Sequence, residues 1–157
     1  MEKPTTIHST FVLERSFAAT PERVFDAFAN TEKKRRWFFE SDHFELQHHE
    51  LDFKVGGTER ARMKMGQGTP IAGLTITSDT VYEDIQPGRR IVTAYRMSID
   101  GRPFSVSIAT IEMTPSEIGT ELTLTHQGAY FEGADGPEMR KGGWEHLLSK
   151  LEAELAG

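Results

Sequence analysis

Apolar and polar side chains alternate along most of the chain, a pattern typical of strands that bury one face. The first such segment covers residues 9–17, where Phe11, Leu13 and Phe17 share one parity. Six more segments of this kind lie between about residues 44 and 128, separated by turn sequences rich in glycine and proline. The pattern therefore predicts a sheet of seven strands with one apolar and one wet face.

Parity also assigns several later side chains to the apolar face. Leu122, Leu124 and His126 alternate with polar residues, and Tyr95 shares a face with Met97 in an earlier strand. We expect both sets to point towards the interior, with His126 near its mouth.

Two local signals refine the sheet. Asp100-Gly101 suits a type I′ hairpin, whose two central residues need positive φ, so consecutive strands are expected to be antiparallel. Within residues 106–113 the apolar parity changes between Ile108 and Ile111, which suggests a bulge that bends the sheet.

Two short helices are predicted directly after the first strand. Thr20 can cap the first helix, and Pro21 fits its first helical position. Asn30-Thr31 ends that helix and offers a cap for a second one, which runs through Trp37.

The end of the chain is predicted to be a long helix that starts near residue 137 or 143 and ends near 155. Its apolar residues recur at three- and four-residue spacing, namely Trp144, Leu147, Leu148, Leu151 and Leu155. Because the helix is apolar on one side only, it needs a partner surface. Gly142-Gly143 weakens its first part by roughly 1 kcal/mol per glycine, so we expect a bend or a late start there.

These elements predict an α+β fold in which a strongly curved sheet closes over the long helix. A single helix is only about 10 Å wide, so its concave side leaves space for large side chains or a ligand. Pockets for small molecules are mostly apolar with a few polar groups. We expect the ligand-binding residues to be Phe25, Phe28, Trp37, Phe53, Met63, Met65, Tyr95, Met97, Phe104, Leu124, His126, Tyr130, Phe131, Trp144 and Leu148.

Seven motifs in order extend over residues 9–155. They are Phe11 to Phe17, Pro21 to Phe28, Arg36-Trp37-Phe38, Asp52 to Gly57, Tyr82 to Val92, Gly119 to Gly128, and Gly143-Trp144. In these motifs the chain resembles the bacterial branch of the START-like, polyketide-cyclase superfamily that is similar to the activator of heat-shock-chaperone ATPase. The resemblance implies a helix-grip fold, with no cofactor and no single reaction shared across the family. Its members range from carriers of lipids and other hydrophobic ligands to cyclases and a co-chaperone.

Composition narrows the class of protein further. The 157 residues are the size of one domain, so residues 1–157 are expected to form a single helix-grip domain. The net charge of −6 opposes binding to nucleic acid. The chain has no cysteine, which excludes disulfides, thiolate metal sites and a cysteine nucleophile. We see neither a secretion signal nor a membrane span and expect a cytoplasmic protein without a cofactor.

The densest group of ionisable residues surrounds His48-His49. His48, Glu50 and Asp52 share one strand face and could hold a metal, whereas His49 points to the other face. We favour a solvated, charged strand face and expect no metal. The basic run of residues 33–36 could attract an acidic partner, and we interpret it as the solvated side of a short helix.

His126 has two interpretations. It could bind a ligand or act as a general base, since the usual pKa of histidine lies near neutral pH. We favour a structural histidine bonded to the loop at residues 128–131, and we assign no catalytic residue.

Three functions remain open. The first is binding of a small hydrophobic molecule, such as a lipid or an aromatic metabolite. The second is a cyclase- or hydrolase-type enzyme, for which His126 with Tyr95 or Glu50 is the best acid–base pair. The third is a protein-interaction domain, including chaperone assistance, which would expose an apolar patch. Self-association into a homodimer stays open as well.

Overall fold

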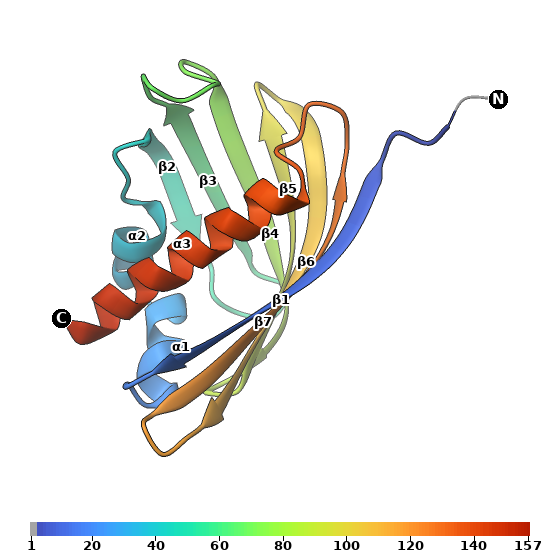
Figure 1. The fold of residues 1–157 in the computed structure, drawn as a ribbon. Helices are drawn as coiled ribbons and strands as arrows, with labels where there is room; N and C mark the ends of the chain where they lie inside the picture. Colours follow the sequence, from blue (N-terminus) through green and yellow to red (C-terminus); the bar gives the residue numbers. More distant parts are fainter. Residues whose placement is uncertain (1–2) are drawn as a thin grey trace.

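The computed structural model describes residues 3–157, and within them one seven-stranded antiparallel sheet has the order β1-β7-β6-β5-β4-β3-β2 (Figure 1). Strand β1 (Ile7–Phe17) is followed by α1 (Pro21–Ala29), α2 (Thr31–Phe39), β2 (Phe44–Leu51), β3 (Thr58–Met65), β4 (Thr75–Gln86), β5 (Arg90–Ile99), β6 (Arg102–Pro115), β7 (Thr120–Tyr130) and α3 (Pro137–Ala156). This order and the antiparallel pairing confirm the α+β fold predicted from the alternation of apolar and polar residues, and they agree with the helix-grip fold that the resemblance implied.

The short helices begin where their caps were predicted. The side chain of Thr20 accepts a hydrogen bond from the backbone N–H of Arg23 at 3.3 Å. The side chain of Asn30 likewise accepts from the backbone N–H of Lys33 at 3.0 Å and so starts α2. Each cap satisfies an amide that the helix itself leaves without a partner.

Helix α3 starts at Pro137, the earlier of the two predicted starts, and continues through Gly142 and Gly143. A Cβ atom at either glycine would meet no atom within 4 Å, so neither glycine is required by close packing. The helix is therefore intrinsically weak at this point. Its first turns are held by Arg140, which is described with the candidate site below.

The Asp100-Gly101 hairpin is confirmed, because these residues have φ values of 46° and 83°. The predicted bulge within residues 106–113 is wrong, since the register of β6 with β7 is continuous from Ser105 to Pro115. The parity changes because Ile108 lies on the outer face, where it is 44% exposed. The register shift in β6 lies earlier, opposite Met97 and Ser98 of β5.

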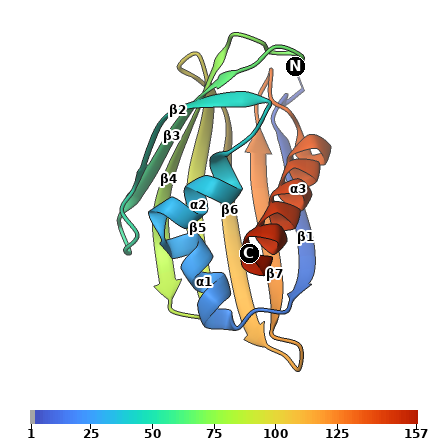
Figure 2. The ribbon, with the colours of Figure 1, turned by 90° about the vertical axis from the view of Figure 1, so that its left-hand side faces the viewer.

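All three helices lie on the same face of the curved sheet, as Figure 2 shows. The larger apolar cluster joins this face to the helices and includes Trp37 of α2, Leu124 of β7 and Leu148 of α3. A smaller cluster around Met63 and Phe104 lies towards the β2 edge of the sheet. The sheet therefore closes on a core that is divided between two apolar clusters.

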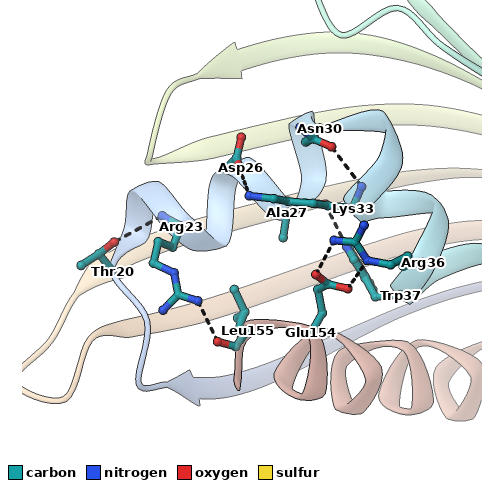
Figure 3. A network of polar contacts seen from close by, with 10 residues as sticks. All are labelled: Thr20, Arg23, Asp26, Ala27, Asn30, Lys33, Arg36, Trp37, Glu154 and Leu155. Carbon is teal, nitrogen blue, oxygen red and sulfur yellow. Dashed lines mark hydrogen bonds and ion pairs between the residues drawn. The ribbon is translucent and has the colours of Figure 1, made fainter. Parts of the chain in front are cut away.

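The C-terminal end of α3 is fastened to the two short helices (Figure 3). Arg36 donates two hydrogen bonds to the carboxylate of Glu154, at 3.1 and 2.9 Å. Arg23 donates to the backbone carbonyl of Leu155 at 2.8 Å, and the indole of Trp37 donates to the carbonyl of Ala27 at 2.8 Å. The bonds from Arg36 and Arg23 fix the position of α3 across the sheet at one end, whereas the bond from Trp37 joins α2 to α1.

Candidate functional site

Arg140 occupies the apolar stripe of α3, one turn before Trp144 and two turns before Leu148. Its side chain is buried under the helix, with only 7% of the residue exposed. A buried arginine is rare without partners, because its charge has lost its hydration. Its contacts therefore indicate what this part of the interior can bind.

The guanidinium of Arg140 bonds to both a carboxylate and the sheet. It pairs with both oxygens of Asp135, at 2.8 and 2.9 Å. It also donates to the hydroxyl of Ser105 at 2.8 Å and, more weakly, to that of Ser107 at 3.4 Å. A fourth partner is the hydroxyl of Tyr95 at 3.0 Å. The arginine thus ties the start of α3 to strands β5 and β6.

The hydroxyl of Tyr95 links this arginine to His126. It accepts hydrogen bonds from Arg140 and, at 3.4 Å, from the indole N–H of Trp144, which can only donate. Its own proton is therefore donated to Nε2 of His126, which lies 2.7 Å away. It follows that Nδ1 of His126 carries the proton of the neutral imidazole.

His126 is fully buried, and its ring stacks on Phe11 with centroids 4.7 Å apart. Burial, and next the charge of Arg140, lower the pKa of His126 from 6.5 to about 4. The imidazole is thus neutral at pH 7. The favoured bond to the loop at residues 128–131 is wrong, because the partner of His126 is Tyr95.

Two buried side-chain atoms have no hydrogen-bond partner within residues 3–157: Nδ1 of His126 and the hydroxyl of Tyr130. Tyr130 is only 1% exposed, and its ring lies over Gly128, whose Cβ would fall 2.9 Å from the ring and the hydroxyl. The guanidinium of Arg140 lies 5.2 Å from the centre of the same ring. Unpaired buried polar atoms are uncommon in native proteins and call for an explanation.

We use the name Arg140 cluster for Tyr95, Ser105, Ser107, His126, Tyr130, Asp135, Arg140 and Trp144. A second polar group, the Lys34 cluster, consists of Lys34, His49, Glu59 and Tyr82 and lies beneath α2.

Every polar atom of the Lys34 cluster has a partner. The carboxylate of Glu59 accepts from Lys34 at 2.5 Å, from Tyr82 at 2.8 Å and from Nε2 of His49 at 2.8 Å. The other ring nitrogen of His49 accepts from Arg35 at 3.3 Å. The ammonium of Lys34 also lies 4.8 Å from the ring centre of Phe38. This cluster is a closed network of ion pair and hydrogen bonds.

The pKa values of this network reflect its pairing. Burial opposes the charged form of Glu59, but Lys34 and the hydrogen bonds from His49, Lys34 and Tyr82 still lower the pKa of Glu59 to about 2. Burial raises the pKa of Tyr82 to about 12. Burial opposes the charge of Lys34 too, yet Glu59 holds the pKa of that lysine above its usual value.

The structure brings together only some of the side chains predicted to bind a ligand. Near the Arg140 cluster it places Tyr95, Leu124, His126, Tyr130, Trp144 and Leu148. Phe25, Phe28, Trp37 and Phe53 belong to the same larger apolar cluster as Leu124, Trp144 and Leu148, whereas Met63, Met65 and Phe104 belong to the smaller cluster near β2. Met97 contacts both apolar clusters, and Phe131 is half-buried beyond the end of β7.

Two open hollows lie outside the space between the sheet and α3. One, of about 560 Å³, lies between the end of α2 and β2, where it is lined by Arg35, Phe39 and Phe44 among others. The other, of about 290 Å³, lies on the outer face of the sheet around Val81 and Val106. Neither hollow contacts His126 or Arg140.

The strand face predicted to be solvated, that of His48, Glu50 and Asp52, is exposed as predicted. His48 and Glu50 pair at 3.1 Å on the outside, as expected, whereas His49 is buried against Glu59. Over residues 3–157, no three histidine or carboxylate side chains lie close enough together to hold a metal ion. No helix in this range is long and apolar enough to cross a membrane.

The interpretation of residues 33–36 as a solvated face is wrong for Lys34, which is buried, and its neighbours are also paired. Lys33 pairs with Asp26, and Arg36 with Glu154. Helical spacing indicates that Lys34 is buried, because Lys34 lies three residues before Trp37, on the same face of the helix. Arg140 lies four residues before Trp144 and eight before Leu148, on the same helix face, so helical spacing could have predicted that both cations are buried.

Strand parity likewise indicates that Glu59 is buried. It alternates in step with Ala61 and Met63, which are buried on the inner face of β3. Neither helical spacing nor strand parity predicts the position of the loop residue Asp135, because that position depends on its pairing with Arg140.

Comparison with known proteins agrees with this architecture. Residues 18–156 match the family model described as Activator of Hsp90 ATPase homolog 1-like protein. The Mll3558 protein from Rhizobium loti is 42% identical, with a TM-score of 0.85 over 96% of this chain and 99% of that chain. An uncharacterised protein from Rhizobium leguminosarum is 33% identical, with a TM-score of 0.88 over 96% of both chains. An Aeromonas hydrophila protein at 17% identity shares the fold, with a TM-score of 0.68 over 94% of this chain and 92% of that chain. No curated protein matches the chain.

Proposed function

The chain belongs to the Activator of Hsp90 ATPase homolog 1-like family, and from that premise we propose that it binds a small hydrophobic molecule between the sheet and the start of α3. The START-like fold is compatible with this function. The bound molecule would contact apolar side chains such as Leu124, Trp144 and Leu148 and reach the Arg140 cluster with a polar end.

The observation that carries the proposal is the pair of unpaired polar atoms inside an apolar surrounding. A buried donor without an acceptor costs about 1–3 kcal/mol, so the protein alone gains nothing from keeping His126 Nδ1 and the Tyr130 hydroxyl there. A ligand that supplied the missing partner would recover this free energy. Small-molecule sites combine an apolar wall with a few such polar groups.

The alternative of an acid–base enzyme is less well supported. The predicted pair Tyr95 and His126 is in contact, but the hydroxyl of Tyr95 already donates to His126 and accepts from Arg140 and Trp144. Proton transfer to a substrate would first require one of these bonds to break. The other predicted partner, Glu50, lies on the outer face of β2. Binding requires neither change.

The test uses N-phenyl-1-naphthylamine, an apolar probe whose fluorescence rises out of water. We expect saturable binding that the variant Leu124→Trp reduces at least several-fold, because the added indole occupies space beside His126. Val12→Trp is the matched control, since Val12 lies on the outer face of β1 and is 52% exposed. Absence of saturable binding, or equal loss in both variants, would contradict the proposal.

A further inference from the structure

We propose that the ligand presents an uncharged carbonyl oxygen to the Arg140 cluster, where Nδ1–H of His126 and the hydroxyl of Tyr130 both donate to it. This inference rests on the proposed function and names the chemical class of the ligand. It concerns the two buried polar atoms that have no partner within residues 3–157.

The first step is the direction of the hydrogen bond at His126. The hydroxyl of Tyr95 accepts from Arg140 and Trp144 and has one proton of its own, which goes to Nε2. The free nitrogen of the neutral ring is then an N–H group, which can only donate. A ligand atom in front of it must be an acceptor, and this excludes ammonium and apolar groups as partners.

The second donor comes from the same strand. Tyr130 follows His126 by four residues on β7, so both side chains point to the inner face. Its ring bends back along the strand over Gly128, which lies between the two. Any larger residue at position 128 would clash with this ring orientation, because a Cβ would fall 2.9 Å from it. The glycine thus allows the hydroxyl to lie on the His126 side of Tyr130.

The third step concerns the charge of the ligand. Arg140 supplies the nearest positive charge, but both oxygens of Asp135 already neutralise it. His126 adds no charge at neutral pH, since burial lowers its pKa. A carboxylate ligand would therefore bring an uncompensated charge into the interior, at a high desolvation cost. A carbonyl oxygen needs donors but no counter-charge, and two donors match its two lone pairs.

The Lys34 cluster supports the interpretation of these atoms as ligand contacts. It is similarly buried and likewise contains one cation and one carboxylate, yet the part of the chain that the structure describes leaves none of its buried side-chain polar atoms unpaired. The same fold is thus able to complete a buried network. Unpaired donors at only one of the two clusters indicate a partner that is not part of the chain.

The experiment compares three probes of one shape: 2-acetylnaphthalene, 2-ethylnaphthalene and 2-naphthoate at pH 7, titrated calorimetrically into the full chain. We expect the ketone to bind at least about 5-fold more tightly than the hydrocarbon, because each hydrogen bond is worth roughly 2- to 10-fold. We expect the naphthoate to bind more weakly than the ketone. Equal affinity of ketone and hydrocarbon would overturn the carbonyl contact, whereas tighter binding of naphthoate would overturn the uncharged class.

Two variants test whether the preference for the ketone over the hydrocarbon comes from His126 and Tyr130. Tyr130→Phe and His126→Phe should each lower the ketone affinity about 3- to 10-fold and leave the ethylnaphthalene affinity unchanged. Tyr82→Phe, in the Lys34 cluster, is the matched control and should change neither. If His126→Phe fails to fold, Tyr130→Phe alone decides. A ketone preference that survives in Tyr130→Phe would overturn the inference while the proposed function stands. If none of the three probes binds the native chain, the proposed function itself fails.

Discussion

The Lys34 cluster and the Arg140 cluster are similarly buried, but they differ in whether all of their buried polar atoms have hydrogen-bond partners. In the Lys34 cluster a carboxylate, an ammonium, a phenol and an imidazole satisfy one another on the inner face of β2, β3 and β4. In the Arg140 cluster the cation is fully paired, but two neighbouring groups on β7 are not.

This difference separates a structural network from a binding site more clearly than charge or burial does. Both clusters contain a buried cation and a perturbed pKa, and both would attract attention as titratable groups. Of the two clusters, only the Arg140 cluster contains buried side-chain atoms without a hydrogen-bond partner among residues 3–157. We therefore expect changes in the Lys34 cluster to reduce stability alone, and removal of the unpaired Tyr130 hydroxyl to weaken binding without reducing stability.

The largest expected effect is that of Glu59→Gln. The change leaves the buried Lys34 ammonium without its counter-charge, so the free energy of unfolding should fall by about 3–5 kcal/mol. Urea unfolding at pH 7 measures this loss. Glu50→Gln on the outer face is the control and should stay within about 0.5 kcal/mol of the parent. A loss below about 1 kcal/mol for Glu59→Gln would show that the network is not structural.

Acid should destabilise the two clusters over different pH ranges. The folded-state pKa of His126 is lowered from 6.5 to about 4, so its contribution is fully present above pH 6.5 and is lost as the pH falls to 4. We expect a loss of about 3 kcal/mol from this group. For Glu59 the corresponding range runs from pH 4.5 down to about 2.

The variant His126→Gln checks the pH assignment. It should flatten the dependence of unfolding free energy on pH between 6.5 and 4 and leave the fall below pH 4 in place. Urea titrations at half-unit pH intervals give both ranges. An unchanged slope between pH 6.5 and 4 would assign that loss to another group.

The smallest effects should come from two matched changes of tyrosine to phenylalanine. Tyr82→Phe removes hydrogen bonds to Glu59 and Lys34, which should cost about 1.5–2 kcal/mol because charged partners are involved. Tyr130→Phe removes a buried hydroxyl without a partner and should raise the stability by about 1 kcal/mol, the lower end of the cost of such a group. Thermal unfolding of both variants measures the contrast. Equal losses would show that the Tyr130 hydroxyl has a partner in solution.

Most of the fold could be predicted from the sequence, because caps, hairpins and parity are local. Thr20, Asn30 and Asp100-Gly101 occupy the predicted positions, and β7 buries the predicted side chains. The predicted bulge near Ile108 is wrong for a physical reason. An exposed isoleucine disturbs the apolar parity without changing the backbone, and exposed apolar residues are common.

The site was less predictable, since it depends on cations that an apolar pattern does not select. Tyr95, His126 and Trp144 were predicted as ligand contacts because they share buried faces with apolar neighbours, and Tyr130 because of its large side chain. Arg140 was not, although it lies on the same helical stripe as Trp144. Whether a buried polar atom has a partner depends on loop positions such as Asp135, and sequence spacing does not give these.

The position of β1 beside β7 has a consequence for folding. Phe17 pairs with Thr120 and Ile7 with Tyr130, so this edge joins segments separated by roughly 100 residues of chain, whereas the other pairings connect consecutive strands. Closing such a long loop costs more entropy and slows folding. During synthesis β1 leaves the ribosome first and has no partner strand until β7 has followed it. The nascent chain must therefore carry an unpaired apolar edge through most of its translation, a condition under which strands aggregate.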